Sequence, residues 1–182
     1  YTYQDYEKLS FILGLRGDLH NMHGFWLSPK ANFKYNLPKD LTIKLAVGKG
    51  YRTPNLIAEN IGALASNRTI ALEGPQGFES AWNTGGSVMK KFYLGFQQAS
   101  IVVDYYRTDF QNQVITDLYQ NQYEVHFYNL DGKSFSNSAQ LEISYSPYKR
   151  FDVKTAYRFY DVKATYNNRL VNVPFISQQR AF

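Results

Sequence analysis

The chain has 182 residues and a formal net charge of +5, and its 16 Tyr and 13 Phe are mixed with many polar residues. The absence of cysteine excludes disulfides and thiolate metal sites. The 20 Lys and Arg are scattered rather than gathered into the basic stripe of a nucleic-acid-binding protein, so no nucleic-acid partner is expected.

Alternation of apolar and polar residues is the main structural signal, and it predicts two-faced β-strands. It begins at residues 9–18 and returns at residues 25–36. After a turn at residues 37–40, the segment 41–52 alternates again. One of its faces carries Leu41, Ile43, Leu45 and Val47, and the other carries Thr42, Lys44, Ala46 and Gly48.

A long connection over residues 53–78 follows, with one expected helical turn after Pro54, at residues 55–60. Further alternating segments lie in the second half of the chain, at residues 99–106, 139–145 and 151–160. Less regular segments, which we predict as strands mainly from their position, lie at residues 79–93, 110–118 and 124–130. The sequence thus predicts an all-β chain of about eight antiparallel strands.

The connections differ in length at the two ends of these strands. Short links are expected at residues 37–40, 94–97 and 146–149, and longer loops at residues 20–24, 53–78, 119–123 and 165–172. Short turns at one end and long loops at the other are typical of outer-membrane β-barrels. No run in the sequence reaches the about 18 apolar residues of a transmembrane helix.

Periodicity does not by itself say which face of the strands is buried. In a soluble sandwich or lipocalin-like barrel the apolar face would point inward. Here the polar face carries long charged side chains on strand after strand, as a water-filled lumen permits. We therefore favour the wall of a transmembrane β-barrel, with the face of Leu41, Ile43, Leu45 and Val47 toward lipid.

Several segments, in chain order, resemble the barrel of TonB-dependent receptors, the gated outer-membrane transporters for siderophores, cobalamin and other scarce nutrients. The most specific is Gly48-Lys49-Gly50-Tyr51-Arg52-Thr53-Pro54-Asn55-Leu56, which is similar to the family's Gly-aromatic-Arg-Thr/Ala-Pro-Asn-Leu segment. Looser matches follow at residues 72–85, 104–114, 128–142 and 156–162.

The resemblance implies that residues 1–182 are a partial barrel domain, a piece of a barrel of about 22 strands, without the plug domain and the ends of the barrel. It implies a place in the outer membrane of a Gram-negative bacterium and no enzymatic activity or cofactor. The implied partners are outer-membrane lipid, the receptor's own plug domain, the TonB complex through the N-terminal part, and a small-molecule nutrient such as an iron-siderophore or cobalamin.

The external loop is the natural place for ligand contacts, because loops on a rigid wall usually carry specificity. The candidate residues there are Arg52, Asn55, Asn60, Asn67, Arg68 and Glu73. For Arg52, which lies at a strand end before a rigid Thr-Pro pair, a structural anchor is favoured over a ligand contact.

Catalytic and metal sites find little support in the sequence. His20 and His23 are closely spaced, with Asp18 nearby, but exposed polar loop residues are the default interpretation. Asp104, Asp109 and Asp117 do not share one strand face, and we interpret them as solvated carboxylates of the lumen or loops.

Two rival functions remain open from the residues alone. One is a passive porin-type barrel closed by these strands, whose interior the long lumen-facing side chains would crowd. The other is a soluble β-sheet module that binds a carbohydrate or another ligand. Dependence on detergent would separate the soluble module from both barrels.

Overall fold

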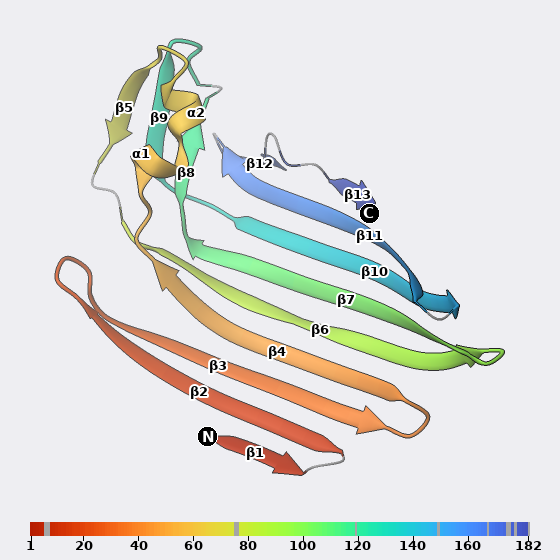
Figure 1. The fold of residues 1–182 in the computed structure, drawn as a ribbon. Helices are drawn as coiled ribbons and strands as arrows, with labels where there is room; N and C mark the ends of the chain where they lie inside the picture. The colour runs from red at the N-terminus through yellow and green to blue at the C-terminus, as the bar shows by residue number, and fades with distance from the viewer. Residues whose placement is uncertain are drawn as a thin grey trace.

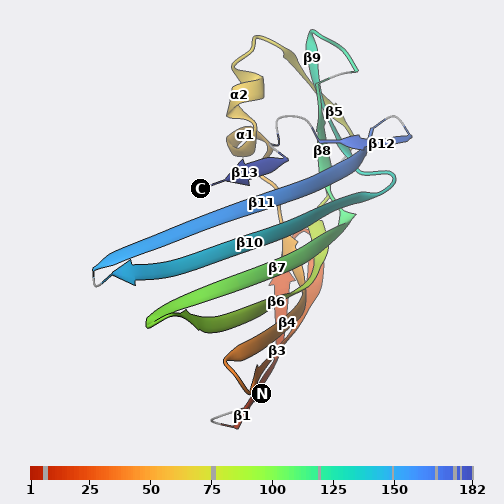
Figure 2. The same ribbon diagram turned by 90° about the vertical axis from the view of Figure 1, so that its right-hand side faces the viewer.

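The computed structural model describes residues 1–5, 8–74, 77–118, 120–148, 150–166, 168–173, 176 and 178–181. Its main feature is one curved antiparallel sheet of ten strands (Figures 1 and 2). The sheet contains β1 (Thr2–Asp5), β2 (Leu9–His20), β3 (Gly24–Leu37), β4 (Leu41–Arg52), β6 (Glu79–Leu94), β7 (Gln97–Asn112), β10 (Ser134–Tyr148), β11 (Phe151–Tyr166), β12 (Arg169–Asn172) and β13 (Gln179–Ala181). The predicted all-β antiparallel class is confirmed.

Neighbouring strands follow one another in the order β1-β2-β3-β4-β6-β7-β10-β11-β12, and β13 also pairs with β11. Every pairing in this sheet is antiparallel. The strands β3, β6, β7, β10 and β11 have 14 to 16 residues each, and β4 has 12. They are long enough for the about 9–11 residues that a tilted strand needs to cross the hydrocarbon layer.

The two faces of the sheet differ sharply in polarity. Directly paired residues of neighbouring strands share a face, so each face can be followed across the sheet as a row of paired residues. One row across six strands is apolar: Tyr35, Ile43, Val88, Val103, Leu141 and Tyr157. The adjacent row on the other face is polar: Lys34, Lys44, Ser87, Asp104, Gln140 and Arg158. The predicted alternation therefore holds in register from strand to strand.

The apolar face is not covered by any described part of the chain. Val88, Val103 and Leu141 are 44%, 50% and 41% exposed. Apart from Glu79 at the start of β6, the buried residues of the long sheet are small, as Ala99 and Ala156 illustrate at 2% and 1% exposure. A contiguous exposed apolar surface marks a membrane or protein contact, and this face has the form of a lipid-facing wall. No helix in the described residues is long and apolar enough to span a membrane.

The connections are short at one end of the sheet. Lys39 and Asp40 turn the chain between β3 and β4 with φ of 64° and 57°, and Gly95 with φ of 64° does so between β6 and β7. Two connections at the opposite end are shorter than expected. Residues 21–23 form a tight turn, and β11 runs to Tyr166 where a loop was predicted from residue 165.

A second body of structure stands above the opposite end of the sheet (Figure 1). It contains α1 (Leu56–Glu59), α2 (Ile61–Leu64) and a three-stranded sheet in the order β5 (Thr69–Glu73), β9 (Glu124–Asn129), β8 (Val114–Asp117). We call these five elements the loop unit. The pairing of β5 with β9 is parallel, so two connections far apart in sequence are folded together.

The less regular segments of the sequence divide between these two bodies. Residues 79–93 lie in a wall strand, as predicted. Residues 110–118 and 124–130 also contain strands, as predicted, but only residues 110–112 belong to the wall, where they end β7; the others form β8 and β9 of the loop unit. The reason is that Val125 and Phe127, at 0% and 1% exposure, are buried in a packed core rather than presented to lipid.

Candidate functional site

A buried carboxylate joins the wall to the loop unit. Glu79 begins β6 and is 5% exposed. Its Oε2 accepts a hydrogen bond from Nε of Arg52 at the end of β4, and its Oε1 accepts one from the backbone N–H of Val114, at 3.1 Å. A buried charge must be paired and hydrogen-bonded to be tolerated, and Glu79 meets both conditions. Three strands therefore meet at one side chain.

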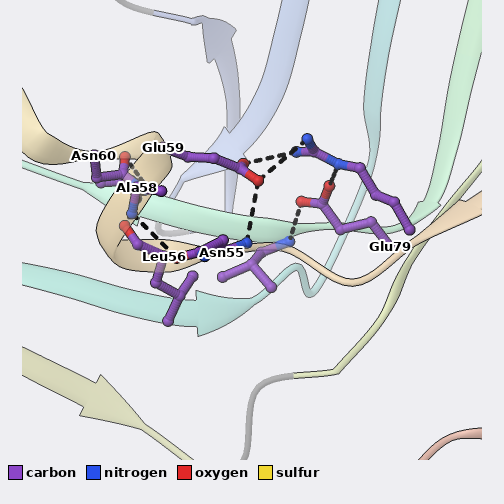
Figure 3. A network of polar contacts seen from close by, with 9 residues as sticks. Asn55, Leu56, Ala58, Glu59, Asn60 and Glu79 are labelled. Atoms are coloured by element: carbon purple, nitrogen blue, oxygen red, sulfur yellow. Dashed lines mark hydrogen bonds and ion pairs between the residues drawn. The ribbon is translucent and has the colours of Figure 1, made fainter.

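Arg52 continues this network into the first helix of the loop unit (Figure 3). Its Nη2 lies 3.0 Å from Oε2 of Glu59. Oε1 of Glu59 accepts a hydrogen bond from the Asn55 backbone N–H at 3.1 Å, and the Asn55 side chain accepts one from the Ala58 N–H at 3.1 Å. Asn55 is thus the N-cap of α1, and the two contacts satisfy amides that a short helix leaves unpaired.

The loop unit has its own hydrophobic core. Val114, Val125 and Phe127 are buried together, and Leu56 and Leu118 pack against them. A side-chain contact also ties helix to sheet, because Thr116 Oγ1 donates to Oδ1 of Asn60 at 3.1 Å. The core and this contact make the loop unit a folded cap rather than a set of independent loops.

A cavity of about 580 Å³ lies between this cap and the end of β11. Its polar lining includes Asn60, Arg68 and Gln113, and its apolar lining includes Ile115 and Ala164. The size falls within the usual range of small-molecule pockets.

The other face of the three-stranded sheet carries a chain of titratable groups. Nδ1 of His126 lies 2.6 Å from Oε1 of Glu73 on β5, and its Nε2 lies 2.9 Å from Oε2 of Glu124. These hydrogen bonds, the one to Glu73 most of all, raise the pKa of His126. On the same face the Tyr128 hydroxyl donates to Oδ2 of Asp117 at 3.2 Å. Burial and the Asp117 charge raise the pKa of Tyr128.

These groups do not form a metal centre. The two carboxylates next to His126 bind opposite nitrogens of the ring, so one ion cannot be held by all three. In the described ranges no cluster of three His, Asp or Glu side chains has the geometry of a cation site.

Comparison with known protein families identifies the family to which this sheet belongs. Residues 2–177 match the family described as TonB dependent receptor-like, beta-barrel. The chain belongs to this family. TonB-dependent receptors are non-enzymatic transporters of the Gram-negative outer membrane, which confirms the family, the location and the absence of catalytic function expected from the sequence.

A solved siderophore receptor has a similar fold. The crystal structure of the siderophore receptor PirA from Pseudomonas aeruginosa superposes with a TM-score of 0.61 at 16% sequence identity. The match covers 86% of this chain and 32% of the PirA chain, so the chain spans about a third of that receptor. At this identity the likeness establishes the fold. Comparison with curated proteins gave no match.

The match assigns the two faces of the wall in this TonB-dependent receptor. In an outer-membrane barrel the apolar band is the lipid side and the polar face lines the lumen. The polar row with Lys34, Lys44 and Asp104 then faces the lumen. The loop unit lies at the end with the long connections, the end that the sequence predicts to be external, and we also call it the cap.

The six ligand-contact candidates of the receptor fall into three places. Arg52 and Asn55 lie in the anchoring network around α1, as the anchor interpretation of Arg52 anticipated. Asn60 and Arg68 line the cavity, and Glu73 binds His126 on the other face of the sheet. Asn67 is exposed in the turn before β5, with φ of 57°.

Several important residues were not among the candidates. Glu79, Gln113 and His126 lie far from their partners in sequence, and no local pattern marks such contacts. A ring cluster at the external ends of β2, β3 and β4 was missed as a group. In it Trp26 stacks on His20 at 5.2 Å and on Tyr51 at 5.5 Å between ring centroids.

Neither the histidine pair nor the aspartates form a reactive group. His20 and His23 stack on one another at 4.9 Å. Asp104 lies in the lumen row and Asp109 pairs with Arg107 at 2.6 Å. The prediction of a solvated carboxylate was wrong for Asp117, which is 0% exposed because β8 is part of a packed sheet.

Proposed function

We propose that this chain is part of a TonB-dependent active transporter that binds a scarce nutrient, such as an iron-siderophore or cobalamin, and imports it across the outer membrane. The observation that carries the proposal is the anchored cap. Two long external connections fold into one unit, and Glu79 on β6 fastens β8 of that unit to β4 and β6, beside a ligand-sized cavity.

The wall and the cap would have different parts in transport. The wall presents its apolar face to outer-membrane lipid and its polar face to the lumen. The cap positions the ligand at the external mouth. In the whole receptor, a plug domain preceding this segment closes the lumen, and the TonB complex acts through the N-terminal part to displace it. On this proposal residues 1–182 are a partial barrel domain.

The candidate ligand contacts fall into two groups: side chains that can reach a ligand and side chains that are bound to other protein groups. Arg68 and Asn67 are the side chains of the external connection best placed to reach a ligand in the cavity or above it, whereas Asn60 lines the cavity with an amide that is bound to Thr116 and Leu56. Arg52, Asn55 and Glu73 have protein partners and would position the cap. An iron-siderophore is the first ligand class to test, because the structural neighbour is itself a siderophore receptor.

The test measures uptake by the full-length parent receptor. Cells with and without the receptor gene are given a panel of iron-siderophores and cobalamin as sole sources of the nutrient, and uptake is followed with radiolabelled ligand. Receptor-dependent uptake that stops when the proton gradient is dissipated supports the proposal. Receptor-dependent uptake that persists without the gradient supports a passive porin. Solubility of the receptor without detergent would instead point to a soluble binding module.

A further inference from the structure

The cavity under the cap contains a positive charge without a protein partner. Arg68 immediately precedes β5, is half-buried, and lines the cavity. Over the described ranges its guanidinium makes no hydrogen bond and no ion pair, whereas Arg52 nearby binds two carboxylates. A partly desolvated guanidinium is normally paired. A guanidinium in the cavity lining without a protein partner indicates a binding site for an anion.

A second polar group in the cavity is also unsatisfied. Gln113 connects β7 to β8, and its side-chain oxygen is buried without a hydrogen-bond partner in the described structure. Leaving such a group unpaired costs about 1–3 kcal/mol.

The remaining lining is mostly apolar. Val114, Ile115 and Ala164 are 9%, 2% and 1% exposed, and Leu118 lies beside them. Glu59 also borders the cavity, but its carboxylate is held by Arg52 and by the Asn55 backbone N–H. The cavity therefore combines one unpaired cation with an apolar wall.

We propose that this cavity binds the carboxylate of an amphipathic ligand. The carboxylate lies against Arg68, and a compact apolar portion packs on Val114, Leu118 and Val173. One guanidinium matches the single charge and two oxygens of a carboxylate, which it binds in a bidentate fork. A phosphate dianion would call for further cations. The inference rests on the proposed function, since it assigns a ligand chemistry to the external site of the transporter.

Binding of a simple probe tests the inference. The full-length receptor in lipid nanodiscs is titrated calorimetrically with 2-naphthoate and with the neutral 2-naphthamide. Naphthoate should bind more tightly than the amide. Arg68→Gln should weaken naphthoate binding about 10- to 100-fold, because a hydrogen bond to a charged group is lost. Arg68→Lys, which keeps the charge, should lose less.

The matched control is Arg150→Gln, which removes an exposed guanidinium from the turn between β10 and β11, at the end of the sheet opposite the cavity lining. Naphthoate affinity should be unchanged in this variant. Slower electrophoretic migration after heating verifies that each variant holds a folded barrel. Equal affinity for naphthoate and naphthamide, no naphthoate binding, or an equal loss in both Gln variants overturns the inference.

This experiment is independent of transport. If naphthoate binding follows Arg68 but the receptor shows no energised uptake, the proposed function fails and the anion site stands. If uptake is energised while naphthoate binding ignores Arg68, the anion site fails and the transporter stands.

Discussion

The backbone N–H of Val114 donates a 3.1 Å hydrogen bond to Oε1 of Glu79, and this contact joins β8, an edge strand of the cap's sheet, to the wall. The other oxygen of the same carboxylate accepts from Arg52. One buried side chain thus holds the starts of both connections that form the cap. Arg52 ends β4, just before the first connection, and Val114 begins β8 in the second.

Replacement of this carboxylate should loosen the cap without unfolding the wall. For Glu79→Gln we expect a loss of about 1–3 kcal/mol in the local stability of the cap, because the buried charge pair is lost while Arg52, 60% exposed, can be rehydrated. Protease cleavage within residues 53–78 on intact cells should become faster. Asp131→Asn, an exposed carboxylate in the second connection, is the control and should leave cleavage unchanged. Equal cleavage in both variants would contradict the anchoring role of Glu79.

Contact between the two external connections should be stronger in acid. A neutral imidazole has one N–H, so His126 can donate to both Glu73 and Glu124 only when protonated. The pKa of His126 in the folded protein is raised from 6.5. The stabilisation of the cap by these two hydrogen bonds is therefore complete below pH 6.5 and is lost as the pH rises through the raised pKa.

Hydrogen exchange measures this contact directly. After correction for intrinsic rates, the amides of β5 and β9 should be better protected at about pH 5 than at about pH 9 in the native receptor. The difference should vanish in His126→Gln and remain in His20→Gln. A pH dependence that survives the loss of His126 would assign it to another group.

Adjacent residues of β4 should be exposed to different environments, one to lipid and the other to the water of the lumen. Ile43 pairs with Val88 on the apolar face, and Lys44 pairs with Ser87 on the polar face. In outer membranes, Ile43→Cys should react with a lipid-partitioning thiol reagent and Lys44→Cys with a water-soluble one. Residues 1–182 contain no cysteine, so within this segment each label reports one position. Reversed labels, or aqueous labelling of both, would refute the assigned orientation.

A charge on the lipid face should be costly. Leu45 is 53% exposed and pairs with Phe33 on β3 and Gly86 on β6. Leu45→Arg should destabilise the folded barrel by about 2–4 kcal/mol if this row lies near the bilayer midplane. Lys44→Arg, one residue away on the lumen face, should cost little. Urea unfolding in lipid vesicles compares the two, and similar costs would argue against a lipid-facing row.

Gly85 on β6 should not tolerate a methyl group. A Cβ there would lie 2.3 Å from the Tyr105 carbonyl oxygen and 2.7 Å from Tyr106 Cα, so β6 and β7 would have to separate. We expect Gly85→Ala to destabilise the barrel by about 1–3 kcal/mol. Gly50→Ala meets nothing within 4 Å and is the matched control. Unfolding midpoints of the two variants test the difference, and equal midpoints would show that the strands adjust freely.

Much of the wall could be predicted from the sequence, because its strands repeat one local rule. A strand such as β4 must place Ile43 and Lys44 on opposite faces wherever it sits, so alternation reveals both faces before any pairing is known. The Arg-Thr-Pro-Asn run likewise marks a strand end and a helix start locally, and the helix capped by Asn55 begins there.

The cap could not be predicted in the same way, since its stability comes from contacts between distant segments. His126 meets Glu73 only because β9 lies parallel to β5, and Gln113 enters the cavity only because β8 turns away from the wall. The buried pair Val125 and Phe127 alternates with polar residues as a wall strand would, so periodicity alone misplaced it.

The parallel pairing of β5 with β9 also constrains the order of folding. The antiparallel strands β6 and β7 form a hairpin with a tight turn, and both lie between β5 and β9 in the chain. Closing the parallel ladder first would require a long loop to be ordered at high entropic cost, whereas the hairpin shortens that loop beforehand. The cap should therefore be the last part of this segment to become structured, after the wall strands beneath it have paired.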